Sequence, residues 1–295
     1  MLSMQNGNKL TYCVIIPVHN EEEFIGKTLE SIINQTYLPG QVIVVNDNSS
    51  DSTAEIIKMF TEKHPFIKLV NSESSDGQHL PGSKIIEAFY KGFYHIDQEW
   101  DIISKLDADV ILPPNYFYEI VKRMQQNSKV GIAGGIVYVL QNHEWIYENY
   151  TSKKHIRGAI KTYSRQCFEK IGGLKKSMGW DTADELLANY YNFEVAVFED
   201  LIVKLLKPTG KDYKNIRYEQ IGKSFNLMRY GCLIAFIAAL KASYKAKNPF
   251  LFFSVSKGYL KSFLNSDSKI VTKEEGKFIR HYRLAGILKR FLNRA

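Results

Sequence analysis

Two carboxylates separated by one small residue are the pattern in this chain that most clearly suggests chemistry: Asp107 and Asp109 flank Ala108. The preceding segment, 101–106, is mainly apolar, which is typical of a buried strand. If it is a strand, both carboxylates lie at its C-terminal end, the edge of an open α/β sheet where ligands bind. Two neighbouring carboxylates suit a hard divalent cation, which in turn holds a diphosphate. A solvated turn that closes the strand is the alternative interpretation.

Further polar residues follow two other predicted strands at the same edge. Pro17, His19 and Glu21 come directly after the first strand and open a helix, whose N-terminus favours an anion. Asp47 follows the second strand, where a carboxylate accepts a hydrogen bond from a base such as uracil. The alternative for the acidic residues 21–23 is that they only stabilise the first turn of the helix through its dipole. For the polar residues after Asp47, the alternative is a turn with a helix cap.

Two later segments hold candidates for anion binding and for acceptor chemistry. Lys84 precedes a predicted helix and either reaches a base or phosphate or is an ordinary solvated charge. Asp184 lies in a predicted loop after Trp180, where a carboxylate could take the proton from an attacking hydroxyl. Trp180 could stack on a sugar ring, and Trp180 and Asp181 are the acceptor-binding candidates. Asp184 could equally cap the helix that follows.

Apolar periodicity predicts the elements that would position these residues. Strand-like and helix-like segments alternate through the first half of the chain, which implies a mostly parallel α/β sheet with helices on both faces. Pro17 ends the first strand, and Gly134 and Gly135 interrupt the last one as a bulge or a close approach. The predicted strands are 12–16, 41–45, 66–70, 101–106 and 130–140, and the predicted helices are 22–34, 52–60, 83–93 and 115–126.

The pattern changes after residue 150. A loop-rich stretch leads to Trp180, and the segment 185–206 is predicted to be largely helical or mixed. After a break at Pro208, two more helices are predicted, at 225–247 and 250–264. We expect a main domain with a nucleotide-sugar half and an acceptor half, followed by a basic, amphipathic helical tail. The expected bounds are 1–220 for the domain, about 10–110 and 111–220 for its halves, and 221–295 for the tail.

Charge is distributed unevenly along the chain. The net charge is +8, yet residues 201–295 contain 20 Lys and Arg against 5 Asp and Glu. This asymmetry suggests an anionic partner for the tail. Apolar stretches between the charges favour a membrane surface, and no nucleic-acid partner is expected. The longest uncharged run there, 230–240, is too short to span a bilayer, which needs about 20 residues. Helices packed on the main domain are the alternative.

The cysteines and the chain start bear on location. Three scattered cysteines without CxxC spacing indicate neither a disulfide framework nor a zinc site. The polar segment 1–10 lacks the apolar stretch of a signal peptide. We therefore expect a cytoplasmic protein that is peripheral on the inner face of the cell membrane.

Two stretches together resemble the family 2 glycosyltransferases, which have the GT-A fold. Residues 14–53, VIIPVHNEEEFIGKTLESIINQTYLPGQVIVVNDNSSDST, are similar to that family's opening signature. Residues 105–117, KLDADVILPPNYF, are similar to its DxD strand and the following turn. The resemblance covers about residues 11–210. It implies an inverting transferase that uses a nucleotide-diphosphate sugar of the UDP or GDP type. The acceptor is a hydroxyl of a glycan or lipid-linked molecule, in cell-surface polysaccharide or glycoconjugate synthesis.

The resemblance also implies roles on the donor side. Pro17 and Glu21 lie at the nucleotide edge, and Asp47 hydrogen-bonds the base. His19 and Lys84 are counted with them as nucleotide-sugar-binding candidates. These two residues are candidates because of their own position and charge, whereas the other assignments follow from the motifs that resemble the family.

Metal and acceptor roles follow in the same way. Asp107 and Asp109 match the two DxD acids: the first lies toward the ribose or the metal, and the second holds Mn²⁺ or Mg²⁺ on the diphosphate. Asp184 matches the Asp of the TED segment of processive members, the catalytic base, although Ala183 replaces the usual Glu. Relatives often have a His in the segment matching 204–208. This chain has none there, so metal coordination is expected to rely on Asp109 and water.

Two other functions remain open on sequence alone. A sugar nucleotidyltransferase also combines such a sheet with paired carboxylates, but its Gly-rich basic loop is absent. A non-catalytic nucleotide-sugar-binding or membrane scaffold protein is the second alternative, since Ala183 departs from the pattern. No QxxRW motif follows Asp184, so a processive synthase such as a cellulose synthase is not expected.

Overall fold

The computed structural model describes residues 10–72, 82–148, 153–207 and 218–292. The chain divides into two units whose segments alternate along the sequence. Unit 1 comprises 1–77, 85–173 and 192–209, and unit 2 comprises 78–84, 174–191 and 210–295. The domain boundary that the sequence predicts at residue 220 stays a prediction.

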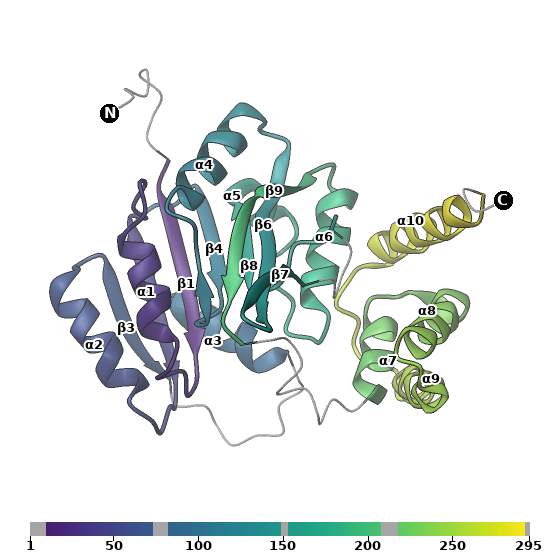
Figure 1. The fold of residues 1–295 in the computed structure, drawn as a ribbon. Coiled ribbons are helices and arrows are strands. Elements are labelled where there is room, and N and C mark those ends of the chain that lie inside the picture. Colours follow the sequence, from purple (N-terminus) through teal and green to yellow (C-terminus); the bar gives the residue numbers. More distant parts are fainter. Residues whose placement is uncertain (1–9, 73–81, 149–152, 208–217, 293–295) are drawn as a thin grey trace. The chain divides into compact units, whose positions relative to one another are not determined.

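Unit 1 is built on one sheet (Figure 1). Its strands are β1 Tyr12–Val18, β2 Gln41–Asp47, β3 Ile67–Ser72, β4 Ile102–Leu106, β5 Val110–Ile111, β6 Val130–Gln141, β7 Glu144–Tyr147, β8 Ile160–Ser164 and β9 Glu194–Leu205. Within the described ranges their order is β3-β2-β1-β4-β8-β6-β9-β5, and β7 pairs with β6. Parallel ladders join β3, β2, β1 and β4, and also β6 and β9. β5, β7 and β8 pair antiparallel. The predicted α/β class with a mostly parallel sheet is confirmed.

The strands that lead to the candidate residues are buried on both faces. β1 is buried along its whole length, and β2 is buried except at its last residue. A strand covered by helices on both sides needs such a continuous apolar run. The predicted end of the first strand at Ile16 is wrong, because β1 continues through Pro17 to Val18. The ladder to β4 stops at Ile15, so the missing N–H of Pro17 removes no bond on that side.

The helices predicted in the first half are confirmed. They are α1 Ile25–Ile33, α2 Thr53–Lys63, α3 Ser83–Phe93 and α4 Tyr116–Gln126. α1 begins three residues later than predicted, because a turn closed by hydrogen bonds to the Glu21 carbonyl oxygen leads into it. α1 and α2 lie over the part of the sheet that holds β1, β2 and β3 (Figure 1). They therefore cover the strands whose carboxyl ends carry His19 and Asp47.

The second half contains elements that the sequence did not reveal. The loop-rich stretch predicted after residue 150 contains β8 and the short helix α5, Arg165–Lys170. The segment 185–206, predicted to be largely helical or mixed, is mixed: a helix continues to Tyr190, and β9, a strand of twelve residues, follows. In its second half buried Leu201, Val203 and Leu205 alternate with exposed residues, which is the period of a strand.

The glycine pair in β6 admits a close approach of β9. The register between the two strands shifts between Gly134 and Ile136. A Cβ atom on Gly135 would lie 2.0 Å from the carbonyl oxygen of Leu201. Only glycine leaves room for this contact, which confirms both the predicted interruption and its steric reason.

Unit 2 contains helices. They are α6 Trp180–Tyr190, α7 Tyr218–Leu227, α8 Gly231–Lys245, α9 Pro249–Leu264 and α10 Lys273–Leu292. The single helix predicted at 225–247 is wrong, because the chain breaks between α7 and α8. Arg229 and Gly231 adopt left-handed backbone angles there, with φ of 55° and 75°. The helix predicted at 250–264 is confirmed as α9, whose N-terminus is capped by the Asn248 side chain accepting the Phe250 N–H.

α7, α8 and α9 pack around a small apolar core of Ala239, Leu251 and Val255. Glycines bring α7 and α9 close together, since a Cβ on Gly222 would lie 1.8 Å from the Val255 carbonyl oxygen. A Cβ on Gly258 would meet α7 in the same way. Across the described stretches, no helix has enough length and apolar character to cross a bilayer.

Candidate functional site

The carboxylate pair lies in the turn between β4 and β5, at the carboxyl end of β4 as predicted. The Thr28 hydroxyl in α1 donates a hydrogen bond of 2.7 Å to the carbonyl oxygen of Ala108. The Leu206 N–H, just after β9, donates one of 2.9 Å to the carbonyl oxygen of Asp109. The backbone that carries Asp107 and Asp109 is therefore fixed from two sides before any ligand binds.

A buried lysine neutralises the first carboxylate. Lys105 in β4 is 1% exposed, and its ammonium group forms an ion pair with Asp107. The same ammonium group donates to the carbonyl oxygen of Gly158 at 3.2 Å. Lys105 lies opposite Lys161 of β8, which is also fully buried. A buried ammonium group requires partners of this kind, so Lys105 and Asp107 stabilise each other's charge.

A second ion pair closes the other side of the site. The Lys207 ammonium group lies 2.7 Å from a carboxylate oxygen of Glu21 and 5.6 Å from the centroid of the Phe24 ring. The N–H of Glu21 donates to the Thr53 hydroxyl at 2.8 Å, which fixes the start of the acidic run. Glu21 therefore lies near Asp109 at the carboxyl edge of the sheet, while its role toward a nucleotide stays a prediction. Lys207 was not identified from the sequence.

Asp109 lies in the electrostatic field of both pairs. The pKa of Asp109 is raised to about 7, chiefly by burial and also by the negative charges of Asp107 and Glu21, while Lys207 acts in the opposite direction. A carboxyl group with this pKa is partly protonated at neutral pH. A cation bound to it would favour the ionised form and release the proton. The site is therefore short of positive charge at Asp109.

These acids fit a divalent cation that a diphosphate shares. Within the described parts of the chain, no three Asp, Glu, His or Cys side chains converge into a ready-made metal cluster. Magnesium-type ions nevertheless bind through one or two carboxylates together with substrate phosphates. Asp107 and Asp109 supply two hard oxygen donors, and the raised pKa of Asp109 marks where the added charge is needed.

Removal of Lys207 tests this charge balance. We expect Lys207→Met to lower the melting temperature of the metal-free protein by about 5 °C at pH 8, because Glu21 and Asp109 lose their nearest counter-charge. The decrease in melting temperature should be smaller at pH 5, where Asp109 is protonated. Thermal unfolding in EDTA measures both values. Lys204→Met, an exposed position in β9, is the matched control, and an equal loss at the two pH values would contradict the electrostatic explanation.

The turns after β1 and β2 bring two donor-site candidates together. Nδ1 of His19 donates to the carbonyl oxygen of Asp47 at 2.7 Å. The Asp47 carboxylate accepts a hydrogen bond of 2.9 Å from the Ser72 hydroxyl at the end of β3. Lys91 in turn donates to that hydroxyl. Asp47 is thus held at the carboxyl edge of the sheet, while its role toward a base stays a prediction.

Lys84 lies in the first turn of α3 and is exposed. It belongs to unit 2, whereas Asp47 and the DxD pair belong to unit 1. Leu80 and Pro81, which precede it, lie outside the described residues. Binding of a base or phosphate by Lys84 stays a prediction.

The acceptor-side candidates all lie in α6. Asp184 was predicted in a loop, and this is wrong, because α6 begins at Trp180 and includes it. Asp184 is 1% exposed, and it accepts a hydrogen bond of 2.6 Å from the Glu185 N–H. Trp180 is 7% exposed, which leaves little of its ring for stacking on a sugar. Asp181, in the first turn of α6, is half-buried. The functional roles of these residues stay predictions.

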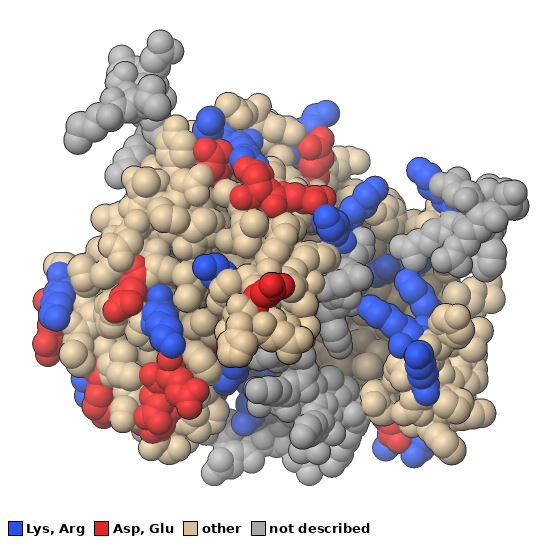
Figure 2. Space-filling model, viewed as in Figure 1, with Lys and Arg blue, Asp and Glu red and all other residues tan. Residues whose placement is uncertain are grey.

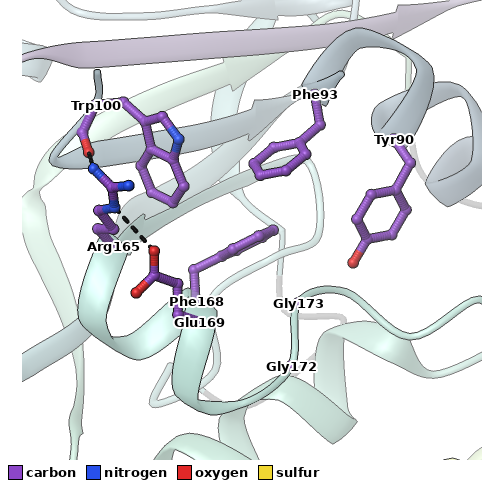
Figure 3. A pocket seen from close by; sticks show the side chains of 8 residues that line it. All are labelled: Tyr90, Phe93, Trp100, Arg165, Phe168, Glu169, Gly172 and Gly173. Atoms are coloured by element: carbon purple, nitrogen blue, oxygen red, sulfur yellow. Dashed lines mark hydrogen bonds and ion pairs between the residues drawn. The ribbon is translucent and has the colours of Figure 1, made fainter. Parts of the chain in front are cut away.

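A separate hollow of about 300 Å³ is lined by residues of α3 and α5, by Trp100 and by two glycines after α5 (Figure 3). Its lining includes Trp100, just before β4, whereas the carboxylate pair follows that strand. Arg165 lies over the Trp100 ring and forms an ion pair with Glu169 (Figure 3). None of the candidate residues lines this hollow.

Curated relatives match part of this chain. A probable glycosyltransferase of Bacillus subtilis, YdaM, is 36% identical over 61% of this chain and 46% of its own length. The poly-β-1,6-N-acetyl-D-glucosamine synthase of Staphylococcus epidermidis is 29% identical over 57% of this chain and 41% of its own length. The chain thus spans less than half the length of these two relatives.

A solved structure and a family model complete the comparison. The mannosyltransferase PcManGT of Pyrobaculum calidifontis, in complex with GDP-Man and Mn²⁺, has a TM-score of 0.55 at 16% identity. The match covers 97% of this chain and 88% of that chain, and it shows the GT-A fold. Residues 13–177, more than half of the chain, match the model of Glycosyl transferase family 2. The chain therefore belongs to glycosyl transferase family 2.

Proposed function

We propose that this protein is an inverting glycosyltransferase that moves a sugar from a nucleotide-diphosphate sugar to a hydroxyl group. The observation that carries the proposal is the acidic group at the carboxyl edge of the sheet: Asp107, Asp109 and Glu21 with two built-in lysines. Such an edge of an α/β sheet is where nucleotides bind. Family membership supports the same reaction class.

The donor binds along the carboxyl ends of β1, β2 and β4. Asp47 accepts the N–H of a uracil or guanine base, and His19 fixes the backbone beside it. Pro17, at the end of β1, and Lys84, in α3, complete the proposed contacts with the nucleotide sugar. A UDP or GDP donor is consistent with this set, and the similar mannosyltransferase was solved with GDP-Man.

Asp107 and Asp109 would hold Mn²⁺ or Mg²⁺ against the diphosphate. When bound, the ion neutralises the negative charge that builds on the departing nucleoside diphosphate. Lys105 holds Asp107 in place through their ion pair, and Lys207 adds positive charge at the same edge. The similar mannosyltransferase was solved with Mn²⁺, which supports the choice of ion.

Asp184 is the proposed general base. It deprotonates the acceptor hydroxyl, whose oxygen then attacks the anomeric carbon on the face opposite the leaving diphosphate. One displacement forms the new glycosidic bond, breaks the bond to the diphosphate and inverts the anomeric centre. Trp180 and Asp181, in the same helix, are the proposed acceptor contacts.

The proposed acceptor is a glycan or a lipid-linked molecule, in cell-surface polysaccharide or glycoconjugate synthesis. The relative that makes poly-β-1,6-N-acetyl-D-glucosamine supports the polysaccharide context. We place the protein at the inner, cytoplasmic face of the cell membrane, because residues 201–295 contain 20 basic and 5 acidic residues.

A thermal-shift panel tests the donor site. UDP, GDP, dTDP and CDP are each added with and without Mn²⁺. We expect one nucleotide to raise the melting temperature by about 5 °C with Mn²⁺ and by much less in EDTA. Transfer assays with the matching sugar should then release the nucleoside diphosphate. A nucleotidyltransferase would instead release pyrophosphate when it is given a nucleoside triphosphate and a sugar 1-phosphate. No thermal shift with any nucleotide would contradict the proposal.

A further inference from the structure

The corner between α8 and α9 exposes large apolar side chains to solvent. Tyr244 is 85% exposed, Phe250 is 77% exposed and Phe253 is 67% exposed. The corner is ordered by its own backbone, since the Asn248 N–H donates to the carbonyl oxygen of Ser243 and the Asn248 side chain caps α9. Isolated exposed apolar residues are common, but three large rings within ten residues form a patch.

The patch continues along α9. Exposed Leu260 lies seven residues after Phe253, and exposed Leu264 lies eleven residues after Phe253 and fourteen after Phe250. These spacings place all four side chains on one helical face. The opposite face, which includes Leu251, Val255 and Tyr259, is buried. α9 therefore carries large apolar side chains on its exposed face as well as on its buried face.

Lysines accompany the exposed face, and acids are absent from this stretch of sequence. Residues 231–264 contain five lysines and no Asp or Glu. Lys257 and Lys261 fall between the exposed apolar residues of α9, and Lys245 and Lys247 lie at the corner. Figure 2 shows Lys and Arg gathered over the helices of unit 2. Lys257 forms an ion pair with Glu219 of α7, whereas Lys245, Lys247 and Lys261 add positive charge at the border of the apolar patch.

We propose that the exposed face of α9 and the α8–α9 corner dock on an anionic phospholipid surface. Lysines attract the phosphate groups, while phenylalanine, tyrosine and leucine side chains enter the boundary between headgroups and acyl chains. A nucleic acid would satisfy the lysines and leave the apolar face in water. The inference deepens the membrane location proposed above and rests on it, but it does not depend on the sugar transferred.

Vesicle co-sedimentation of the full chain tests the proposal. The vesicles consist of phosphatidylcholine alone or mixed with phosphatidylglycerol. We expect binding only to the mixed vesicles, with a loss at high salt. Phe250→Ser with Phe253→Ser should weaken partitioning at least about tenfold, since both rings leave the interface. Lys247→Glu with Lys261→Glu should weaken it roughly thirtyfold, from about 1 kcal/mol per lysine.

Matched variants on unit 1 control for general effects. Met59→Ser with Tyr94→Ser removes two side chains that are 58% and 77% exposed, and Lys58→Glu with Lys63→Glu reverses two exposed charges in α2. Both pairs should bind vesicles like the unaltered chain.

Three outcomes would overturn the proposal. The first is that the chain binds neutral vesicles as well as anionic ones. The second is that both double variants of unit 2, the phenylalanine pair and the lysine pair, bind vesicles like the unaltered chain. The third is that the chain does not bind vesicles and instead forms a dimer in solution, which Phe250→Ser with Phe253→Ser dissociates. The last outcome would assign the face to a second copy of the chain. The nucleotide shift, measured on the same samples, reports separately on the donor site, so failure of docking is distinguishable from failure of the proposed transfer.

Discussion

Asp184→Asn is expected to lower the rate of sugar transfer by about a thousandfold and to leave nucleotide binding unchanged. The expected size is that of a lost general base. Asn keeps the size of the side chain and still offers an oxygen to the Glu185 N–H, so the start of α6 should remain folded. What the substitution removes is the ability to take a proton from the acceptor hydroxyl. Single-turnover transfer, together with the nucleotide thermal shift, measures the two properties separately.

Glu185→Gln is the matched control for this prediction. It changes the neighbouring carboxylate in the same helix, outside the proposed machinery, and should transfer sugar at the normal rate. A normal rate in Asp184→Asn would remove Asp184 from the role of base. A loss of nucleotide binding in that variant would instead assign it to the donor site or to folding.

Much of the fold could be predicted because several strands are buried on both faces. β1 and β2 are short, mainly apolar runs, β4 is equally buried although it contains Ser104 and Lys105, and polar residues lie at or just after the carboxyl end of each strand. The alternation with amphipathic helices then restricts the topology to a mainly parallel sheet. The position of Asp107 and Asp109 at the carboxyl edge follows from these elements alone.

β9 could not be recognised in the same way, because its two halves have different patterns. The first half is half-buried at most positions, and only the second half alternates strictly between buried and exposed residues. The leucines of α6 just before it favour a helical interpretation that runs on into the strand. Pairing with β6, far away in sequence, decides the conformation.

The lysines of the site were missed for a related reason. In a sequence, a lysine is most often a solvated charge, and nothing local distinguishes Lys105 or Lys207. Lys105 is buried only because β8 pairs with β4. Lys207 reaches Glu21, 186 positions away, only because β9 ends beside the DxD turn. A lysine inside an otherwise apolar strand, as at 105, is the one signal that sequence reasoning could have used.

The second large effect is expected at Asp109. Asp109→Asn should lower transfer at least about a hundredfold, because the ion on the diphosphate loses a charged ligand. It should also change how the metal-free protein responds to pH. The folded pKa of about 7 lies above the ordinary value of 3.8, so the folded state binds this proton more tightly than the unfolded chain does. The resulting stabilisation is complete below pH 3.8 and is lost as the pH rises through 7.

Asp109→Asn cannot lose a proton, so it should be more heat-stable than the unaltered chain in EDTA, by a margin that grows from pH 4 to pH 7 and then levels off. Mn²⁺ with nucleotide should reverse the order, because only the carboxylate gains from the cation. Asp97→Asn is a control of opposite sign: its hydrogen bond with Lys68 holds the pKa of Asp97 below the ordinary value, so this variant should be less stable at neutral pH. A margin for Asp109→Asn that does not vary with pH would contradict the assignment of Asp109 as the carboxylate that needs the cation.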